Sequence, residues 1–275
     1  MRVAGGMSGG AVLGWDIGAA LQLGAALGLS PLILAELLPP IEAVMVRKIQ
    51  YVFEDAPSSL NPRKTIRQII AAPLRSLHGM RGAAMEGRIA ELLDAVNLRH
   101  DFLDRFPHEL SGGQAQRVGI ARALGSSARI LILDEPVSAL DVSVQAQVLN
   151  LLSDLKARLG LTYVFISHDL GVVEAVSDRI AVLYFGSLVE TGPAERVFAR
   201  PRHPYTRMLL NAAPLVGRPL ASTPSGELPD PLDPPAGCAF AGRCAHATEL
   251  CRRIVPTLRH VDGDQLAACH HPLRS

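Results

Sequence analysis

Apolar residues after the first 48 positions of the chain recur in two different patterns. The unbroken aliphatic run Ile130–Leu133 is typical of a strand that is covered on both faces of a sheet, and Tyr163–Ile166 predicts the next strand. Between them, apolar residues recur at the spacing of one helix face, at Val144, Val148, Leu151, Leu152 and Leu155. This alternation of strands with amphipathic helices predicts an α/β fold with a mainly parallel sheet.

The first 48 residues differ from the rest, because they are rich in glycine and alanine and poor in aromatic residues. Within them, residues 17–35 are almost all apolar or small, over about the ~20 residues that a membrane-spanning helix needs. Gln22 and Pro31 interrupt this run, so we interpret it as a buried or irregular segment rather than a spanning helix. Arg2 is the one positive charge ahead of it and no cleavage site is clear, so no signal peptide is predicted.

The last third of the chain carries turn signals and prolines. Two short runs, Ile180–Leu183 and Leu188–Glu190, flank Gly186 and predict a hairpin that closes the sheet. After Arg200, closely spaced prolines argue against a continuous helix or a central strand and predict an irregular tail. All four cysteines lie after Gly237, so they belong to one local site if they belong to any.

The composition of the chain excludes some classes of partner but says little about the fold. With 275 residues and 48% hydrophobic content, the chain is long enough for one large core and a small appendage. Its formal net charge of +1 provides no field that would concentrate nucleic acid or an anionic membrane, and no nucleic-acid partner is predicted. The candidate chemistry therefore has to come from motifs.

The sequence Leu-Ser-Gly-Gly-Gln at residues 110–114 precedes a predicted helix over Ala115–Leu124. Two glycines, Gly112 and Gly113, let the backbone approach a ligand closely, and Ser111 can cap the helix and donate to a phosphate. Because the amide groups at a helix N-terminus carry partial positive charge, this segment is a candidate anion-binding site.

Two acidic residues follow the first predicted strand. Asp134 and Glu135 lie at its carboxyl end, where the ligands of open α/β sheets bind. One carboxylate there can hold the hydration shell of a phosphate-bound magnesium ion, while its neighbour can polarise an attacking water molecule. His168 lies on the loop after the next predicted strand, in a position to reach a terminal phosphate.

These motifs occur in the order in which ABC ATPases carry them, and the chain resembles that class from Ile49 to about Pro272. The resemblance rests on LSGGQ at 110–114, ILILDEP at 130–136, SALD at 138–141 and His168 as the switch histidine. Three further segments, LNPR at 60–63, HPYT at 203–206 and the tail from Gly237-Cys238 to Cys244, are similar to those of the oligopeptide and dipeptide importers.

The resemblance implies three regions and a set of site residues. Residues 49–200 are expected to form the ABC ATPase domain, with a helical subdomain at about 62–125, and residues 201–275 an oligopeptide-importer-type C-terminal extension. Residues 1–48 stand in place of the phosphate-binding loop (P-loop) region. ATP and magnesium (Mg) are the implied ligands, with Glu135 and His168 as catalytic residues and Glu54, Ser111, Gly112, Gly113, Gln114, Asp134 and Asp141 as nucleotide-binding residues.

The same resemblance implies the nucleotide-binding, energy-coupling subunit of a peptide importer. Its expected partners are a sibling ABC ATPase subunit in a heterodimer, two permease subunits and a periplasmic or extracellular peptide-binding protein. Its expected place is the cytoplasmic face of the inner membrane, as a peripheral subunit. The permeases and the binding protein would choose the peptide cargo, so the sequence of this chain does not reveal it.

Two other functions stay open at this point. A soluble ABC ATPase of DNA repair or translation would carry a long coiled coil or two motif sets, whereas here one set is present and Glu54 lies close in sequence to Leu110. A non-hydrolysing partner subunit, or a gene fragment, would only lend its Ser111 segment to the nucleotide of a sibling.

The chain departs from the family pattern at the P-loop. The motif G-x-x-x-x-G-K-S/T occurs nowhere in the sequence, although backbone amides, lysine and hydroxyl of that motif hold the phosphates and magnesium. Residues 5–12 keep a glycine frame but place Ala11 and Val12 where lysine and serine or threonine are required. We therefore predict that the chain binds ATP weakly or not at all by itself. A frameshifted or misassigned start of the gene would explain the same segment.

A second departure is Glu54, at a position where the family has a glutamine that senses magnesium. Glutamate keeps the oxygen ligand but loses the amide donor and adds a charge that would repel the terminal phosphate.

The cysteines predict a metal site in the tail. Four thiolates suit an iron–sulfur cluster or structural zinc, and some members of the resembling family hold a [4Fe-4S] cluster in this region. Unligated thiols are the third interpretation, while an expected cytoplasmic location argues against disulfides. The candidate ligands are Cys238, Cys244, Cys251 and Cys269, and nearby histidines that could substitute are His246, His260, His270 and His271.

Overall fold

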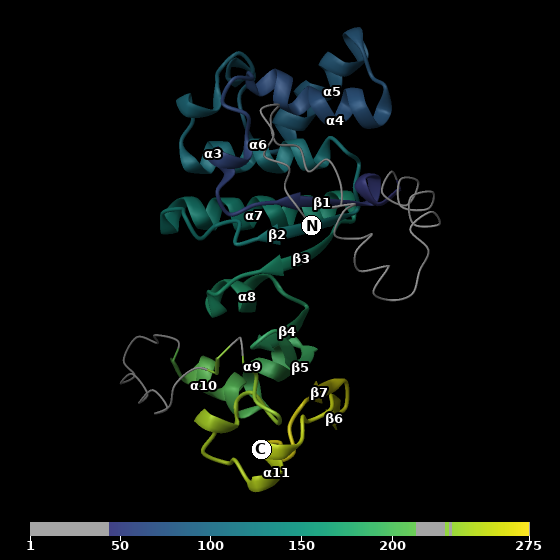
Figure 1. Ribbon diagram of the computed structural model, residues 1–275. Helices are drawn as coiled ribbons and strands as arrows, with labels where there is room; N and C mark the ends of the chain where they lie inside the picture. Colours follow the sequence, from purple (N-terminus) through teal and green to yellow (C-terminus); the bar gives the residue numbers. More distant parts are fainter. Residues whose placement is uncertain (1–43, 213–228, 231–232, 275) are drawn as a thin grey trace. The chain divides into compact units, whose positions relative to one another are not determined.

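In the computed structural model, the described residues are 44–212, 229–230 and 233–274 (Figure 1). They belong to two compact units, which divide the chain between His168 and Asp169. Each unit is described by itself. The apolar run at 17–35 and the glycine frame at 5–12 lie outside the described residues. Among the described residues, no helix combines the length and the apolar character that crossing a membrane requires.

The first unit contains a parallel sheet of three strands in the order β1-β2-β3. Its strands are β1 (Ile49–Val52), β2 (Ile130–Asp134) and β3 (Thr162–Ile166). Leu131 and Leu133 of the central strand are fully buried, as an aliphatic run flanked by two strands requires. The two strands predicted from the apolar runs are therefore confirmed.

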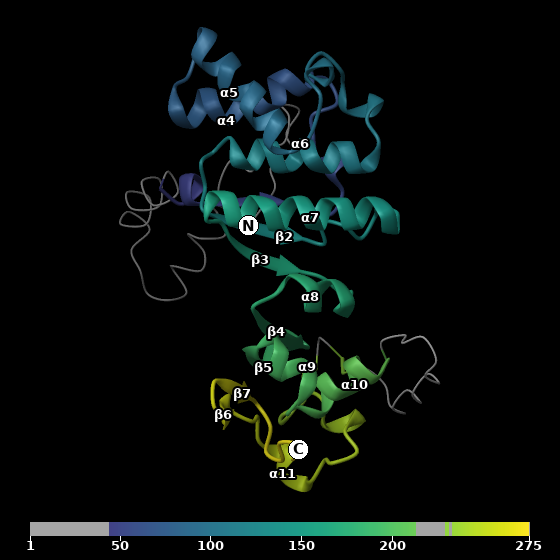
Figure 2. The ribbon, with the colours of Figure 1, turned by 180° about the vertical axis from the view of Figure 1, so that it is seen from behind.

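Helix α7 (Val142–Leu159) packs on this sheet and is seen in front of β2 in Figure 2. Its buried residues Val148, Leu151, Leu152 and Leu155 are four of the five that the helical spacing predicted, and Val144 is half-buried. Because β3 runs parallel to β2, the chain has to cross over between them, and α7 makes that crossover. The strand ends that carry Asp134 and Ile166 consequently lie side by side.

A group of helices is inserted between β1 and β2 (Figure 1). It consists of α3 (Ala56–Ser59), α4 (Ile66–His78), α5 (Gly82–Ala95), the short 3-10 helices η1 (His100–Phe102) and η2 (Pro107–Glu109), and α6 (Gly112–Leu124). These helices share a core of large aliphatic side chains: Ile66, Ile70, Leu74, Ile89, Leu93 and Ile120. The side chain of Gln116 in α6 donates to the carbonyl of Phe53 at 3.3 Å, which ties this group to the end of β1.

The second unit contains an antiparallel sheet in the order β4-β5-β7-β6. Its strands are β4 (Arg179–Tyr184), β5 (Ser187–Pro193), β6 (Arg259–Asp262) and β7 (Gln265–Ala267), and its helices are α8 (Leu170–Val176), α9 (Ala194–Ala199), α10 (Pro204–Ala212), η3 (Ala241–Arg243) and α11 (Glu249–Arg253). The predicted hairpin forms at β4 and β5, with Phe185 and Gly186 both in the left-handed region at its turn. It pairs with β7 rather than closing the parallel sheet, which corrects that part of the prediction.

The expectation of an irregular tail after Arg200 is also wrong in part. Helix α10 begins at Pro204 and runs to Ala212. Proline is tolerated in the first turn of a helix, because the amide hydrogen that it lacks has no partner within the helix there. The next proline, Pro214, comes only after the helix, so the spacing of the prolines left room for it.

Candidate functional site

The predicted acidic pair lies at the carboxyl end of β2. The Tyr51 hydroxyl donates to Asp134 at 3.1 Å, and burial raises the pKa of Tyr51, with its hydrogen bond to Asp134 adding to the effect. Glu135 follows in the left-handed region, at φ 45°, where a residue with a side chain is uncommon. Its backbone N–H donates to the carbonyl of Ile166 at 2.9 Å and so joins the ends of β2 and β3.

Glu135 and His168 form an ion-pair contact at this edge. Nδ1 of His168 lies 2.7 Å from the Glu135 carboxylate, whose side chain is 26% exposed while that of the histidine is 72% exposed. Because an ionised carboxylate can only accept, the histidine donates its Nδ1 hydrogen. The left-handed backbone of Glu135 directs its carboxylate to the loop after β3, where it contacts His168.

Glu54 reaches the same edge from the end of β1. Its carboxylate accepts a hydrogen bond from the Ser138 hydroxyl at 3.1 Å, and that hydroxyl also lies 3.0 Å from the carbonyl of Glu135. The structure therefore brings Glu54, Asp134, Glu135 and His168 to one sheet edge. Ser138 and Tyr51 connect these residues, and neither was predicted as a site residue. Asp141 stands at the N-cap of α7, where its side chain makes no capping hydrogen bond.

Residues Ser111 to Gln114 form the N-terminus of α6, as predicted. Ser111 caps the helix in a reciprocal pair: its hydroxyl accepts from the backbone of Gln114 at 3.4 Å and its backbone donates to the Gln114 side chain at 2.9 Å. A Cβ at Gly113 would stand 2.4 Å from Cγ1 of Val144, and one at Gly112 would stand 3.2 Å from Leu140. The glycines thus let α6 pack against the start of α7 and keep Ser111 exposed at the helix end.

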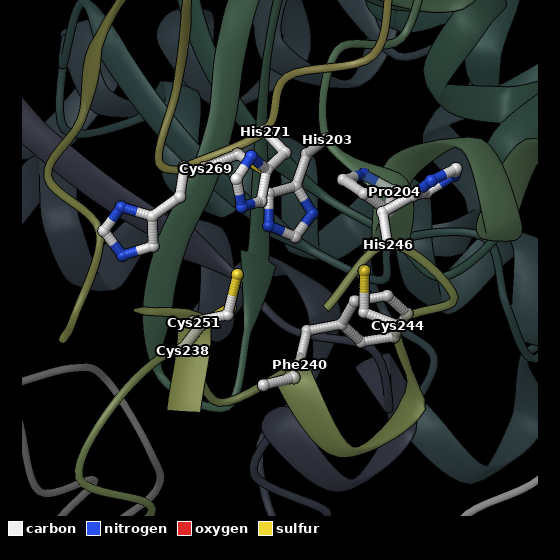
Figure 3. A pocket seen from close by; sticks show the side chains of 11 residues that line it. His203, Pro204, Cys238, Phe240, Cys244, His246, Cys251, Cys269 and His271 are labelled. Carbon is white, nitrogen blue, oxygen red and sulfur yellow. The ribbon is translucent and has the colours of Figure 1, made fainter. Parts of the chain in front are cut away.

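The four cysteines line one pocket of the second unit (Figure 3). All of them are free thiols, Cys251 and Cys269 being buried and Cys238 and Cys244 half-buried. Burial raises the pKa of Cys238, of Cys244 and of Cys269, the last to about 11.

The backbone around the pocket is tightly packed. The N–H of Cys238 donates to the carbonyl of Cys251 at 2.7 Å. A Cβ at Gly237 would stand 2.3 Å from that same carbonyl oxygen, so only glycine fits there. These contacts bring together Cys238, which lies in a loop, and Cys251, which lies in α11.

Histidines also line the pocket, but not the whole predicted set. His246, His270 and His271 line it, whereas His260 lies on β6 and contacts the carbonyl of Gly263 at 3.1 Å. His203, which the sequence did not suggest as a candidate ligand, lines it as well. Among the described residues, no three histidine, cysteine or acidic side chains are already arranged as a metal-binding group. The chemistry of four thiols on one pocket fits a thiolate-bound metal, while their present positions do not define a coordination geometry.

The parallel sheet, the acidic pair with its histidine and the glycine-capped helix together define an ABC-type ATPase domain. Known families match the chain accordingly: "ABC transporter" over residues 35–138, and "Oligopeptide/dipeptide transporter, C-terminal region" over residues 189–251. A third family, described as a family of unknown function, matches residues 6–56.

Individual relatives lead to the same class of protein. The dipeptide transport ATP-binding protein DppF of Haemophilus influenzae is 48% identical over 234 residues, which cover 84% of this chain and 71% of the relative. A putative peptide import ATP-binding protein of Brucella abortus is 49% identical over 82% of this chain and 67% of its own length. The putative oligopeptide transport ATP-binding protein YkfD of Bacillus subtilis is 45% identical over 82% and 70%.

Solved structures share the fold. A post-hydrolysis dimer of the ATP-binding cassette MJ0796 bound to ADP and phosphate matches with a TM-score of 0.50 and 32% identity, over 55% of this chain and 65% of the other. The cbiO1 subunit from Clostridium perfringens matches with a TM-score of 0.51 and 27% identity, over 56% and 60%. The chain belongs to the family of ATP-binding subunits of peptide ABC transporters, which confirms the predicted family and the predicted α/β ABC ATPase fold.

Proposed function

We propose that this chain couples ATP hydrolysis to peptide import as a peripheral subunit on the cytoplasmic face of the inner membrane. It would pair with a sibling ATPase subunit and dock on two permease subunits beside Glu54, while a periplasmic or extracellular binding protein delivers the peptide. The observation that carries the proposal is the Glu135–His168 pair, 2.7 Å apart beside Asp134 at the carboxyl edge of a parallel sheet. The similarity to subunits of dipeptide and peptide transporters supports it.

Each residue of this edge has a separate task in the proposal. Asp134, oriented by the Tyr51 hydroxyl, would hold water ligands of magnesium. Glu135 would polarise the attacking water, and His168 would contact the phosphate being released. Asp141 would take part in binding the nucleotide. Ser111 and the amides of Gly112, Gly113 and Gln114 would face a triphosphate from the N-terminus of α6.

As the alternative, we propose that this chain only lends its Ser111 surface to the nucleotide of a sibling and does not hydrolyse ATP at its own edge. Two observations favour this second function. The P-loop motif is absent from the sequence, and residues 6–56 match a family of unknown function. The helix cap at Ser111 is nevertheless complete, with both hydrogen bonds of the reciprocal pair formed.

The two roles are separated in a complex with a sibling subunit that carries an intact P-loop. Ser111→Arg should lower the ATPase rate of the complex on the order of 100-fold, because it fills the helix end that faces the phosphates. Glu135→Gln should leave the rate unchanged. The control is Ser76→Arg on the exposed face of α4. If Glu135→Gln lowers the rate as strongly as Ser111→Arg, both edges hydrolyse ATP and the lending role is wrong.

For the cysteine pocket we propose a bound metal group, with Cys238, Cys244, Cys251 and Cys269 as ligands. An iron–sulfur cluster of the [4Fe-4S] type is the first candidate and structural zinc the second. The full chain purified without oxygen should be brown, with broad absorbance near ~400 nm from thiolate bonds to iron. Colourless protein with one zinc per chain would favour zinc, and protein free of both metals would contradict the proposal.

A further inference from the structure

His203 is the one buried histidine among the four that line the cysteine pocket, with 1% of its surface exposed. It lies directly before α10, and its backbone is fixed by a buried carboxylate on β5. Glu190 accepts from the backbone of His203 at 2.9 Å and from the backbone of Arg202 at 2.7 Å. The Gln265 side chain on β7 donates to the same carboxylate at 2.7 Å. The histidine is therefore held by both central strands of the sheet.

The protonation of the His203 ring follows from one hydrogen bond. The backbone N–H of Tyr205 donates to Nδ1 at 3.1 Å, so His203 caps the first turn of α10. A backbone N–H can only donate, and Nδ1 must therefore be the unprotonated nitrogen of the ring. In the neutral imidazole the hydrogen is on Nε2. The structure thus presents one N–H donor on the side of the ring that faces away from the helix.

The residues around the His203 ring show which part of the pocket its N–H donor lies in. The ring lies beside Phe240, with 5.9 Å between the centroids, and projects among the cysteine side chains of the pocket (Figure 3). The other histidines are placed differently. Nε2 of His270 contacts the carbonyl of Ile254 at 2.9 Å, and Nε2 of His271 contacts the Thr248 hydroxyl at 2.9 Å.

We propose that His203 is a positioning residue whose Nε2–H donates a hydrogen bond to a metal-bound cysteine sulfur in this pocket. The inference rests on the metal group proposed above. A hydrogen bond to a thiolate stabilises the negative charge on the sulfur, which keeps this ligand deprotonated and oriented toward the metal and raises the reduction potential of a cluster. The Glu190 network would keep the donor in place when the metal binds.

Two substitutions separate the donor from the helix cap. His203→Asn keeps an acceptor at the position of Nδ1, and asparagine is a good N-cap, but it removes the distal N–H. His203→Gln removes the cap and keeps an amide N–H near the position of Nε2. The control is His260→Asn, because His260 lies on β6 outside the pocket lining.

The measurement is the rate at which the full-length protein, purified without oxygen, loses its metal to excess chelator. His203→Asn should lose metal about tenfold faster than the wild type, as expected for removal of an outer-shell partner, while His203→Gln and His260→Asn should match the wild type. If the metal is a cluster, its reduction potential should fall in His203→Asn alone.

Each other outcome overturns the inference in a recognisable way. An unchanged rate in His203→Asn, in a wild type that holds metal, shows that no donor acts there and leaves the metal proposal intact. Equal acceleration in His203→Asn and His203→Gln assigns the effect to ring packing instead. A wild type without iron or zinc contradicts the metal proposal together with this one.

Discussion

The acidic sheet edge of the first unit, with Asp134, Glu135 and His168, and the cysteine pocket of the second unit are built in opposite ways. At the edge, Asp134 and Glu135 are neighbours in sequence, and His168 is brought to them because parallel strands end at the same side of a sheet. In the pocket, residues from separate loops and from the start of α10 converge on one buried space. An exposed edge suits a ligand that enters and leaves in each cycle, whereas a buried pocket suits a group that stays.

The largest expected effect concerns the network that supports the pocket. Glu190→Ala would remove the acceptor of three N–H donors, two of them buried, and should lower the free energy of unfolding of the second unit by roughly 3–5 kcal/mol. Urea unfolding followed by circular dichroism measures the change. The exposed Glu174→Ala in α8 is the control and should shift stability by less than about 0.5 kcal/mol. Equal effects of the two would show that the Glu190 network adds nothing to the pocket.

A smaller effect is expected from crowding the pocket backbone. Gly237→Ala places a Cβ 2.3 Å from the Cys251 carbonyl oxygen, so the backbone at residue 237 has to move away from α11. We expect a loss of about 1–3 kcal/mol in stability and a lower metal content per chain. Gly242→Ala, where nothing lies within 4 Å, should change neither quantity. Full metal content in Gly237→Ala would show that the pairing of Cys238 with Cys251 does not shape the site.

The smallest effect is expected at the exposed edge. Glu54→Gln keeps an oxygen that accepts from Ser138, so stability should change by less than about 0.5 kcal/mol. Glu54→Leu removes the acceptor and should cost about 0.5–1.5 kcal/mol, since one hydrogen bond is lost. Thermal unfolding of both variants tests this. Equal losses in Glu54→Gln and Glu54→Leu would mean that the charge, not the hydrogen bond, connects β1 to the acidic turn.

Sequence patterns predicted which residues meet at the acidic sheet edge, but only some of the residues that line the cysteine pocket. The aliphatic run before Asp134 predicted a buried strand. The end of that strand places Asp134 and Glu135 where the ligands of such sheets bind. Prolines suggested an irregular tail, yet Pro204 starts a helix, because proline is compatible with a first turn. The sequence pointed to His203 only as part of the HPYT segment, because nothing around it shows that its ring shares a pocket with distant cysteines.

By itself, the sequence determined the class of the protein. Its motifs consist of neighbouring residues or lie at the ends of strands, so they can be recognised in the sequence. It also showed that the P-loop motif is absent. Only the tertiary structure decided which cysteines and which histidine share one pocket, that Tyr51 orients Asp134 and that Glu135 takes a left-handed backbone. The physical reason is that these relations are distances between residues far apart in sequence, and packing and hydrogen bonding fix them only when the chain has folded.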